Sequence, residues 1–105
     1  MPSTPMYAPR QIALMTGTTT DASGVFPAGN VVARPANPKR AGLIIRNPST
    51  TNPMYVNFGA PAVSGAAGSI PVAALGELRF TGALPSESVN VIGTAGQNYT
   101  IKEIN

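Results

Sequence analysis

The sequence contains no cysteine and no histidine, and each absence excludes a class of chemistry. Without cysteine, neither disulfides nor thiolate metal sites can form. Without histidine, the commonest general base and metal ligand is missing, so Ser-His-Asp and Cys-His arrangements cannot be built. We therefore expect a protein that is not an enzyme and that has no catalytic residue, no metal ligand and no cofactor.

Acidic residues are also scarce. A catalytic carboxylate pair would need two acids brought together in the fold. The sequence has four acids, in different predicted turns and strands and in no spacing typical of such a pair: Asp21, Glu77, Glu87 and Glu103. We expect a solvated structural role for each of them.

Charge of either sign is sparse, at 10% of the residues, so solubility depends on Ser, Thr and Asn. Seven bases against four acids give a formal net charge of +3, and Lys39 and Arg40 are the only adjacent basic pair. Nucleic-acid modules usually combine a clustered basic stripe with stacking aromatics, and the aromatic residues here do not interleave with the bases. We expect no nucleic-acid partner, whereas a mild positive field favours docking on an acidic protein surface.

Long apolar runs are missing as well. No run approaches the roughly 20 residues of a membrane span. The N-terminus lacks the basic and apolar regions of a signal peptide. We expect a protein with no membrane partner that is made and used without export.

Glycine and proline, in contrast, are abundant, with eleven of each, which argues against long helices. A chain of 105 residues is long enough for one domain with a single modest core. Residues 1–10 contain three prolines and predict an extended arm, and residues 11–105 predict a β domain. The arm is either a disordered tail or an anchor that becomes ordered on a neighbouring subunit.

The stretch RAGLIIRNPSTTNPMYVNF, residues 40–58, predicts a central β-hairpin. Two β-prone runs, 41–47 and 54–58, flank a polar connector that begins and ends with proline and so interrupts a strand ladder at both ends. Alternation divides the runs into a buried face and an outward face. The predicted buried residues are Leu43, Ile45, Met54, Val56 and Phe58. Ile44 then points outward, toward a second layer, the arm or another subunit.

Other short alternating runs predict further strands. They are 11–16, 25–26 with 31–34, 69–72 paired with 77–81, 89–92, and 99–104. Residues 17–24 predict a turn, 27–30 a hairpin turn or a bulge, and 59–69 a surface loop. The GTAG run at 93–96 has the spacing of a nucleic-acid GxxG clamp without its flanking helices, which favours a hairpin turn.

The pattern as a whole predicts an all-β fold. About eight short antiparallel strands with no amphipathic helix favour a single β-sandwich or small barrel, and a jelly roll is one form it could take. The predicted core adds five residues to those of the hairpin: Leu78, Phe80, Val89, Val91 and Ile101.

Four segments carry a family resemblance. They are NPSTTNPMYVNFG at 47–59, GSIPV at 68–72, GELRF at 76–80 and VNVIGTAGQNYTIKE at 89–103. The sequence pattern of these segments resembles that of small β-rich virion proteins encoded in the structural regions of tailed bacteriophages, over roughly residues 38–105. Some members of that group are capsid decoration or cement proteins, which bind outside the shell and clamp neighbouring capsomers.

The resemblance implies a non-enzymatic bacteriophage capsid decoration (cement) protein. It would bind the outside of the head and stabilise contacts between major capsid protein subunits, as a dimer or trimer. It would be made in the host cytoplasm and found on the capsid surface of the virion. The candidate contact residues are Met6, Tyr7 and Arg10 in the arm, Ile44, Arg46 and Tyr55 on the outside of the hairpin, and the pair Lys39 and Arg40.

Two alternatives remain open at this point. The first is a tail, neck or fibre component of the same virion. The second is a carbohydrate-binding or host-binding β-sandwich module, in which exposed aromatics would stack on sugar rings. The aromatics considered for that role are Tyr7, Tyr55 and Tyr99.

Overall fold

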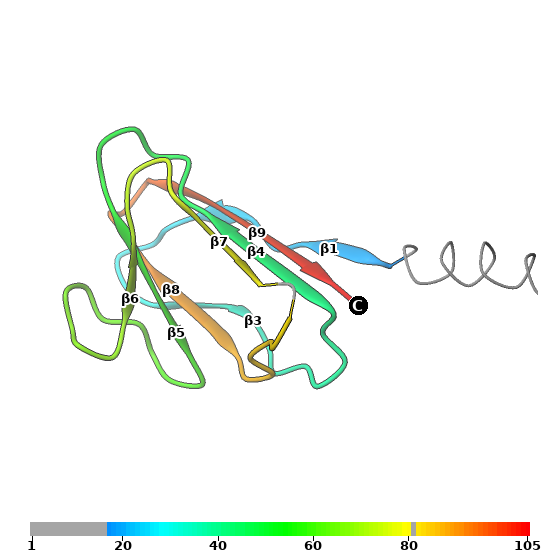
Figure 1. Cartoon of the computed structure of the whole chain (residues 1–105). Helices are drawn as coiled ribbons and strands as arrows, with labels where there is room; N and C mark the ends of the chain where they lie inside the picture. The colour runs from blue at the N-terminus through cyan, green and yellow to red at the C-terminus, as the bar shows by residue number, and fades with distance from the viewer. Residues whose placement is uncertain (1–16, 81) are drawn as a thin grey trace, which may run out of the picture.

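The computed structural model describes residues 17–105 with the exception of residue 81. The described chain forms two antiparallel β-sheets, which are seen edge-on in Figure 1. Sheet I contains β1 (Thr19–Asp21), β2 (Gly24–Val25), β9 (Asn98–Ile104), β4 (Gly42–Arg46) and β7 (Glu77–Phe80). Sheet II contains β3 (Val31–Arg34), β8 (Val89–Ile92), β5 (Met54–Phe58) and β6 (Ile70–Val72). The predicted all-β sandwich is confirmed.

The strand order follows a nested pairing. In sheet I the order is β1-β9-β4-β7, with β2 also pairing β9, and in sheet II it is β3-β8-β5-β6. If β1 and β2 are taken as two halves of one edge strand, the first strand pairs with the last, the second with the second-last, and so on inward to the β5-β6 hairpin. A long hairpin that is rolled up in this way is a jelly roll.

The core lies between the two sheets and is built from the inward side of each strand. Its buried members are Phe26, Leu43, Ile45, Met54, Val56, Val72, Val89, Val91, Tyr99 and Ile101. Phe58, Leu78 and Phe80 pack against this cluster and are partly buried. The alternation in the sequence therefore identified the correct faces of β4, β5, β8 and β9. The rings of Phe26 and Tyr99 pack with centroids 4.6 Å apart and planes tilted by 38°. Tyr99 is buried and is therefore not exposed to bind sugars.

The predicted central hairpin is wrong. β4 and β5 belong to different sheets, and neither is hydrogen-bonded to the other. The polar connector at 48–53 crosses from one sheet to the other instead of turning the chain back within one sheet. The predicted pairing of 69–72 with 77–81 is wrong for the same reason, because β6 lies in sheet II and β7 in sheet I.

Two other local predictions also differ from the structure. Residues 17–24 contain β1 and the start of β2, where we expected a turn. Residues 27–30 form another crossing between sheets, while the bulge lies further on, inside β3 between Val32 and Arg34. The predicted arm at 1–10 and strand at 11–16 fall outside the described residues. In the part of the chain that the structure describes, no helix is long and apolar enough to cross a membrane.

Candidate functional site

A buried ionic cluster joins β9 to the end of β3 and to the connection that follows β3. The Glu103 side chain is fully buried, so the predicted solvated role is wrong for this residue. One carboxylate oxygen accepts a hydrogen bond from Arg40 Nε, and the other accepts from Arg34 Nε at 3.0 Å. The guanidinium of Arg40 also donates to the carbonyls of Pro85 at 2.6 Å, Glu87 at 3.0 Å and Pro35 at 3.1 Å. Each of its three nitrogens therefore donates to a group inside the molecule.

The protonation state of this cluster follows from its contacts. Burial raises the pKa of Glu103, but hydrogen bonds and charges from Arg40 and Arg34 outweigh it and leave the pKa below the ordinary value of 4.5. A carboxylate held ionised in this way is a poor proton donor or acceptor near neutral pH. The cluster acts as a structural tie. The described residues also contain no group of three or more acidic side chains that could hold a metal ion.

A second buried polar cluster joins the 48–53 crossing to the turn before β9. Asn47, which is fully buried, donates to the carbonyls of Asn52 at 2.8 Å, Val72 at 3.1 Å and Ala73 at 3.2 Å. Its side-chain oxygen accepts from Gln97 Nε2 at 2.9 Å. Every buried side-chain nitrogen and oxygen among the described residues has a hydrogen-bond partner. These hydrogen bonds hold the 48–53 crossing against the turn before β9.

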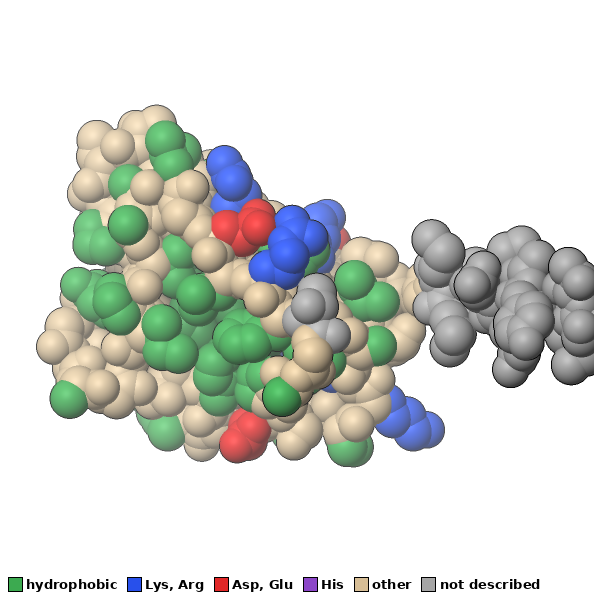
Figure 2. All heavy atoms as spheres, in the orientation of Figure 1, with side chains coloured by type: hydrophobic (Ala, Val, Ile, Leu, Met, Phe, Trp, Pro, Cys, Tyr) green, Lys and Arg blue, Asp and Glu red, His purple; other side chains and the backbone are tan. Residues whose placement is uncertain are grey.

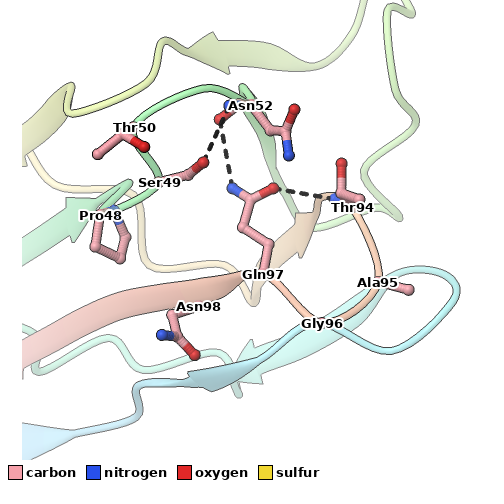
Figure 3. Close-up of a pocket in the computed structure, with 9 residues that line it drawn as sticks. All are labelled: Pro48, Ser49, Thr50, Asn52, Thr94, Ala95, Gly96, Gln97 and Asn98. Carbon is pink, nitrogen blue, oxygen red and sulfur yellow. Dashed lines mark hydrogen bonds between the residues drawn. The ribbon is translucent and has the colours of Figure 1, made fainter.

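An open pocket of about 450 Å³ lies beside this second cluster. It is lined by Pro48, Ser49, Thr50 and Asn52 from the crossing and by Thr94, Ala95, Gly96, Gln97 and Asn98 from the turn and the start of β9. Figure 3 shows Gln97 standing between the two loops, with its amide bonded to the carbonyl of Asn52 at 3.5 Å and its oxygen accepting from the Thr94 amide at 3.2 Å. Figure 1 places these loops at the end of the sandwich away from residue 105.

The outer face of sheet I is charged. Asp21, Lys102, Ile44 and Arg79 are neighbours in one row across β1, β9, β4 and β7. Lys102 Nζ lies 3.3 Å from an Asp21 carboxylate oxygen. Hydrogen bonds from Ser23, together with Lys102, hold the pKa of Asp21 below its ordinary range. In Figure 2 the basic and acidic side chains gather over β7 and β4.

The next row of sheet I is charged too. Glu77 and Arg46 are paired across β7 and β4, with a nitrogen-oxygen distance of 4.0 Å, and Arg79 approaches Glu77 at 3.1 Å. Exposed ion pairs of this kind contribute between 0 and about 1 kcal/mol each. Their main effect is to keep this face hydrated.

The outer face of sheet II carries no free charge. Its four strands contain a single charged residue, Arg34, whose guanidinium is bound to Glu103. The outward positions are instead Val32 on β3, Asn90 and Ile92 on β8, Tyr55 and Asn57 on β5, and Pro71 on β6. We call this set the neutral face.

The 59–69 connection is fastened onto part of the neutral face. Asn30 donates to Asn90 at 3.1 Å and accepts from the backbone amide of Ala62 at 2.7 Å. Asn57 donates to the Pro61 carbonyl at 3.2 Å, and Ala62 is 1% exposed. The predicted surface loop is therefore anchored at its first half, while Val63 beyond the anchor is 54% exposed.

The structure places the candidate contact residues of the predicted hairpin on two different faces of the sandwich. Ile44 and Arg46 lie on the charged face of sheet I, whereas Tyr55 lies on the neutral face of sheet II, on the opposite side of the sandwich. Lys39 is exposed, but Arg40 is 6% exposed and donates four hydrogen bonds inside the molecule, which removes it from the surface. Met6, Tyr7 and Arg10 lie outside the described residues.

Sequence reasoning missed the buried amides and the burial of Glu103. The alternation in the predicted strand 99–104 places Glu103 on the same face as Tyr99 and Ile101. This pattern was the signal from which the burial of Glu103 could have been predicted. For Asn47 and Gln97 the sequence offers no comparable signal, because both stand next to segments with the composition of ordinary turns.

These features define a class: a jelly-roll β-sandwich with internally satisfied polar clusters and two unlike outer faces. No protein-family model matches the sequence, and a search of curated proteins gives no match. A solved structure of a Bacillus endospore appendage, described as a novel family of disulfide-linked pili, has a similar fold with a TM-score of 0.53. The match covers 85% of this chain and 84% of that chain at 19% sequence identity. A likeness at this identity concerns the fold.

Proposed function

We propose that this protein is a non-enzymatic bacteriophage capsid decoration protein, which binds the outside of the head and stabilises contacts between major capsid protein subunits. The observation that supports the proposal most is the contrast between the charged face of sheet I and the neutral face of sheet II. The resemblance of residues 38–105 to virion structural proteins points in the same direction.

The neutral face suits a protein partner. Cores of protein interfaces are depleted of charged residues and enriched in aromatic ones, because desolvating a charge is unfavourable. Tyr55 and Ile92 are paired across β5 and β8 at the middle of this face, next to Pro71. We place these residues against the shell and leave the charged face of sheet I in solvent.

A rigid body suits a clamp, because a protein that is already ordered loses little conformational entropy on binding. The ionic cluster around Glu103 and the amide cluster around Asn47 each join segments that are far apart in the sequence. Exposed Lys39, in the connection between β3 and β4, adds a positive charge that would help docking on an acidic shell.

The two outer faces offer a matched pair of substitutions. Ile92 on the neutral face and Ile44 on the charged face are both outward, partly buried isoleucines in central strands. Ile92→Glu puts a carboxylate into the proposed interface. Ile44→Glu puts the same group between Lys102 and Arg79, where it is electrostatically favourable.

The experiment measures co-sedimentation of each variant with heads that lack this protein. We expect Ile92→Glu to weaken binding by about 100-fold or more, which corresponds to about 3 kcal/mol for a desolvated charge at an interface, and Ile44→Glu to bind like the parent. Equal binding by both variants would exclude the neutral face as the contact. No binding by the parent to any head preparation would refute decoration itself.

The fold likeness to an endospore appendage supports a second candidate, a subunit of an extracellular filament. The neighbour is described as disulfide-linked, and such links are impossible for these 105 residues because they contain no cysteine. A filament would need another kind of contact, such as strand addition.

Three of the four sheet edges argue against strand addition. β6 carries Pro71, which lacks a backbone donor, and β7 carries the charged pair Glu77 and Arg79. The β3 edge is irregular, with a bulge between Val32 and Arg34. Proline, charge and bulges are the devices that keep sheet edges from pairing with other chains.

Particle imaging separates the candidates, including a tail or neck component of the same virion. Decoration predicts density over the whole head, as dimers or trimers at symmetry axes. A tail or neck position predicts few copies at one vertex, and a filament predicts polymers of the purified chain.

A further inference from the structure

The pocket between the 48–52 loop and the 94–98 turn has a distinctive chemistry. None of its nine lining residues is charged and none is aromatic. Ser49, Thr50 and Thr94 contribute hydroxyls, and Asn52 and Asn98 contribute amides. An ionic ligand would find no counter-charge there, and an apolar ligand would leave these groups unpaired.

The polar groups at the pocket divide into fixed and free ones. Gln97 is held at both ends of its amide, by Asn47 and by the Thr94 backbone, so the floor is rigid. The side chains of Thr50, Asn52, Thr94 and Asn98 make no hydrogen bond to another described residue, although each can both donate and accept. Figure 3 shows the side chain of Asn52, from the 48–52 loop, extending toward Thr94 on the other loop.

We propose that this pocket binds an uncharged sugar residue of a glycan. A neutral sugar presents hydroxyls that must each find a donor or an acceptor, which the amides and hydroxyls here supply together. Pro48 and Ala95 offer small apolar surfaces for the C–H side of the ring. The volume of about 450 Å³ falls within the range usual for small-molecule sites, and is ample for a monosaccharide.

The site differs from the tyrosine-based one that the sequence suggested. Tyr99 is buried in the core, and Tyr55 belongs to the neutral face. Without an aromatic platform, a single site would have a dissociation constant on the order of 1 mM. Many copies displayed on one particle would raise the overall avidity without any new contact. The pocket lies at one end of the sandwich, so docking through the neutral face leaves it open.

The test is a titration of the ¹⁵N-labelled full chain, followed by amide chemical shifts, with mannose, galactose, glucose and N-acetylglucosamine in turn. Glucuronate is the charged comparison. We expect at least one neutral sugar to shift the amides of 48–52 and 94–98 and the side-chain amides of Asn52 and Asn98, with saturation in the millimolar range. Glucuronate should bind more weakly than that sugar.

Paired valine substitutions locate the binding. Thr50→Val with Thr94→Val removes two hydroxyls from the pocket and should weaken the sugar about tenfold. Thr19→Val with Thr51→Val removes two exposed hydroxyls that do not line it and should have no effect. Absence of shifts with all four neutral sugars would overturn the proposal, as would equal affinity of the two double variants. Neither result bears on capsid decoration, which the head-binding assay tests separately.

Discussion

Replacing Arg40 by methionine should remove a large part of the unfolding free energy of this domain. Methionine fits the space of the stem but leaves Glu103 with a single, partly exposed partner, Arg34. It also removes the donor that Arg40 provides to the carbonyls of Pro35, Pro85 and Glu87. Three lost hydrogen bonds contribute about 1 kcal/mol each. Removing one member of a buried ion pair costs about 3 to 5 kcal/mol in total, so we expect about 4 kcal/mol.

Arg34→Met is the matched control. Its side chain is 24% exposed, and its hydrogen bond in the described structure goes to Glu103 alone. Water can replace part of the hydrogen bonding that Arg34 provides to Glu103, so we expect the unfolding free energy to fall by only about 1 to 2 kcal/mol. Urea unfolding followed by far-ultraviolet circular dichroism measures both. On thermal unfolding, Arg40→Met should lower Tm by roughly 20 °C.

The effect of Arg40→Met on the unfolding free energy should depend on pH. The folded-state pKa of Glu103 lies below 4.5, so its contribution to stability is present above about pH 4.5 and is lost as the pH falls through the folded-state value. A protonated Glu103 no longer needs Arg40 as a counter-charge. The difference in unfolding free energy between the parent and Arg40→Met should therefore shrink on acidification. A destabilisation below about 1 kcal/mol at pH 7, or one that grows in acid, would refute the electrostatic account.

Three further substitutions test other parts of the structure. Gly93→Ala would place a Cβ 2.5 Å from a ring carbon of buried Phe26, and should lower the unfolding free energy by about 2 to 3 kcal/mol in urea titrations, whereas no change would show that the ring can move aside. Asn47→Leu keeps the branched shape of the side chain but removes its hydrogen bonds to three carbonyls and to Gln97, and should cost about 3 kcal/mol or more by the same assay. Asn30→Ala should release the 59–69 connection and speed its cleavage by proteases with a Tm change of only a few degrees, and unchanged cleavage would contradict the anchoring.

Local patterns predicted the strands better than their partners. Alternation in β5 and β8 placed Val56 and Val91 inward because that pattern reports a half-buried strand whatever its neighbour is. The segment from Pro48 to Pro53 was misread because a hairpin turn and a crossing between sheets use the same residues. What decides between them is pairing with β9 and β8, which come much later in the chain.

The candidate sites were harder to predict for a related reason. The outward positions of Ile44 and Tyr55 were correct individually, yet they face opposite sides once their strands lie in different sheets. Arg40 looked like a surface base because its acidic partner is 63 positions away. A pocket such as the one beside Gln97 exists only after two distant loops meet, so no single stretch of sequence contains it.

The position of β9 has a consequence for how the protein is synthesised. This strand follows the eight other described strands in the sequence, yet it lies inside sheet I between β1, β2 and β4, and it brings Glu103 to its two arginines. A nascent chain that has not yet released β9 from the ribosome leaves its first strands unpaired and Phe26 and Ile45 open to water. Folding of the sandwich must then wait until β9 has left the ribosome, and chaperones can act in that interval.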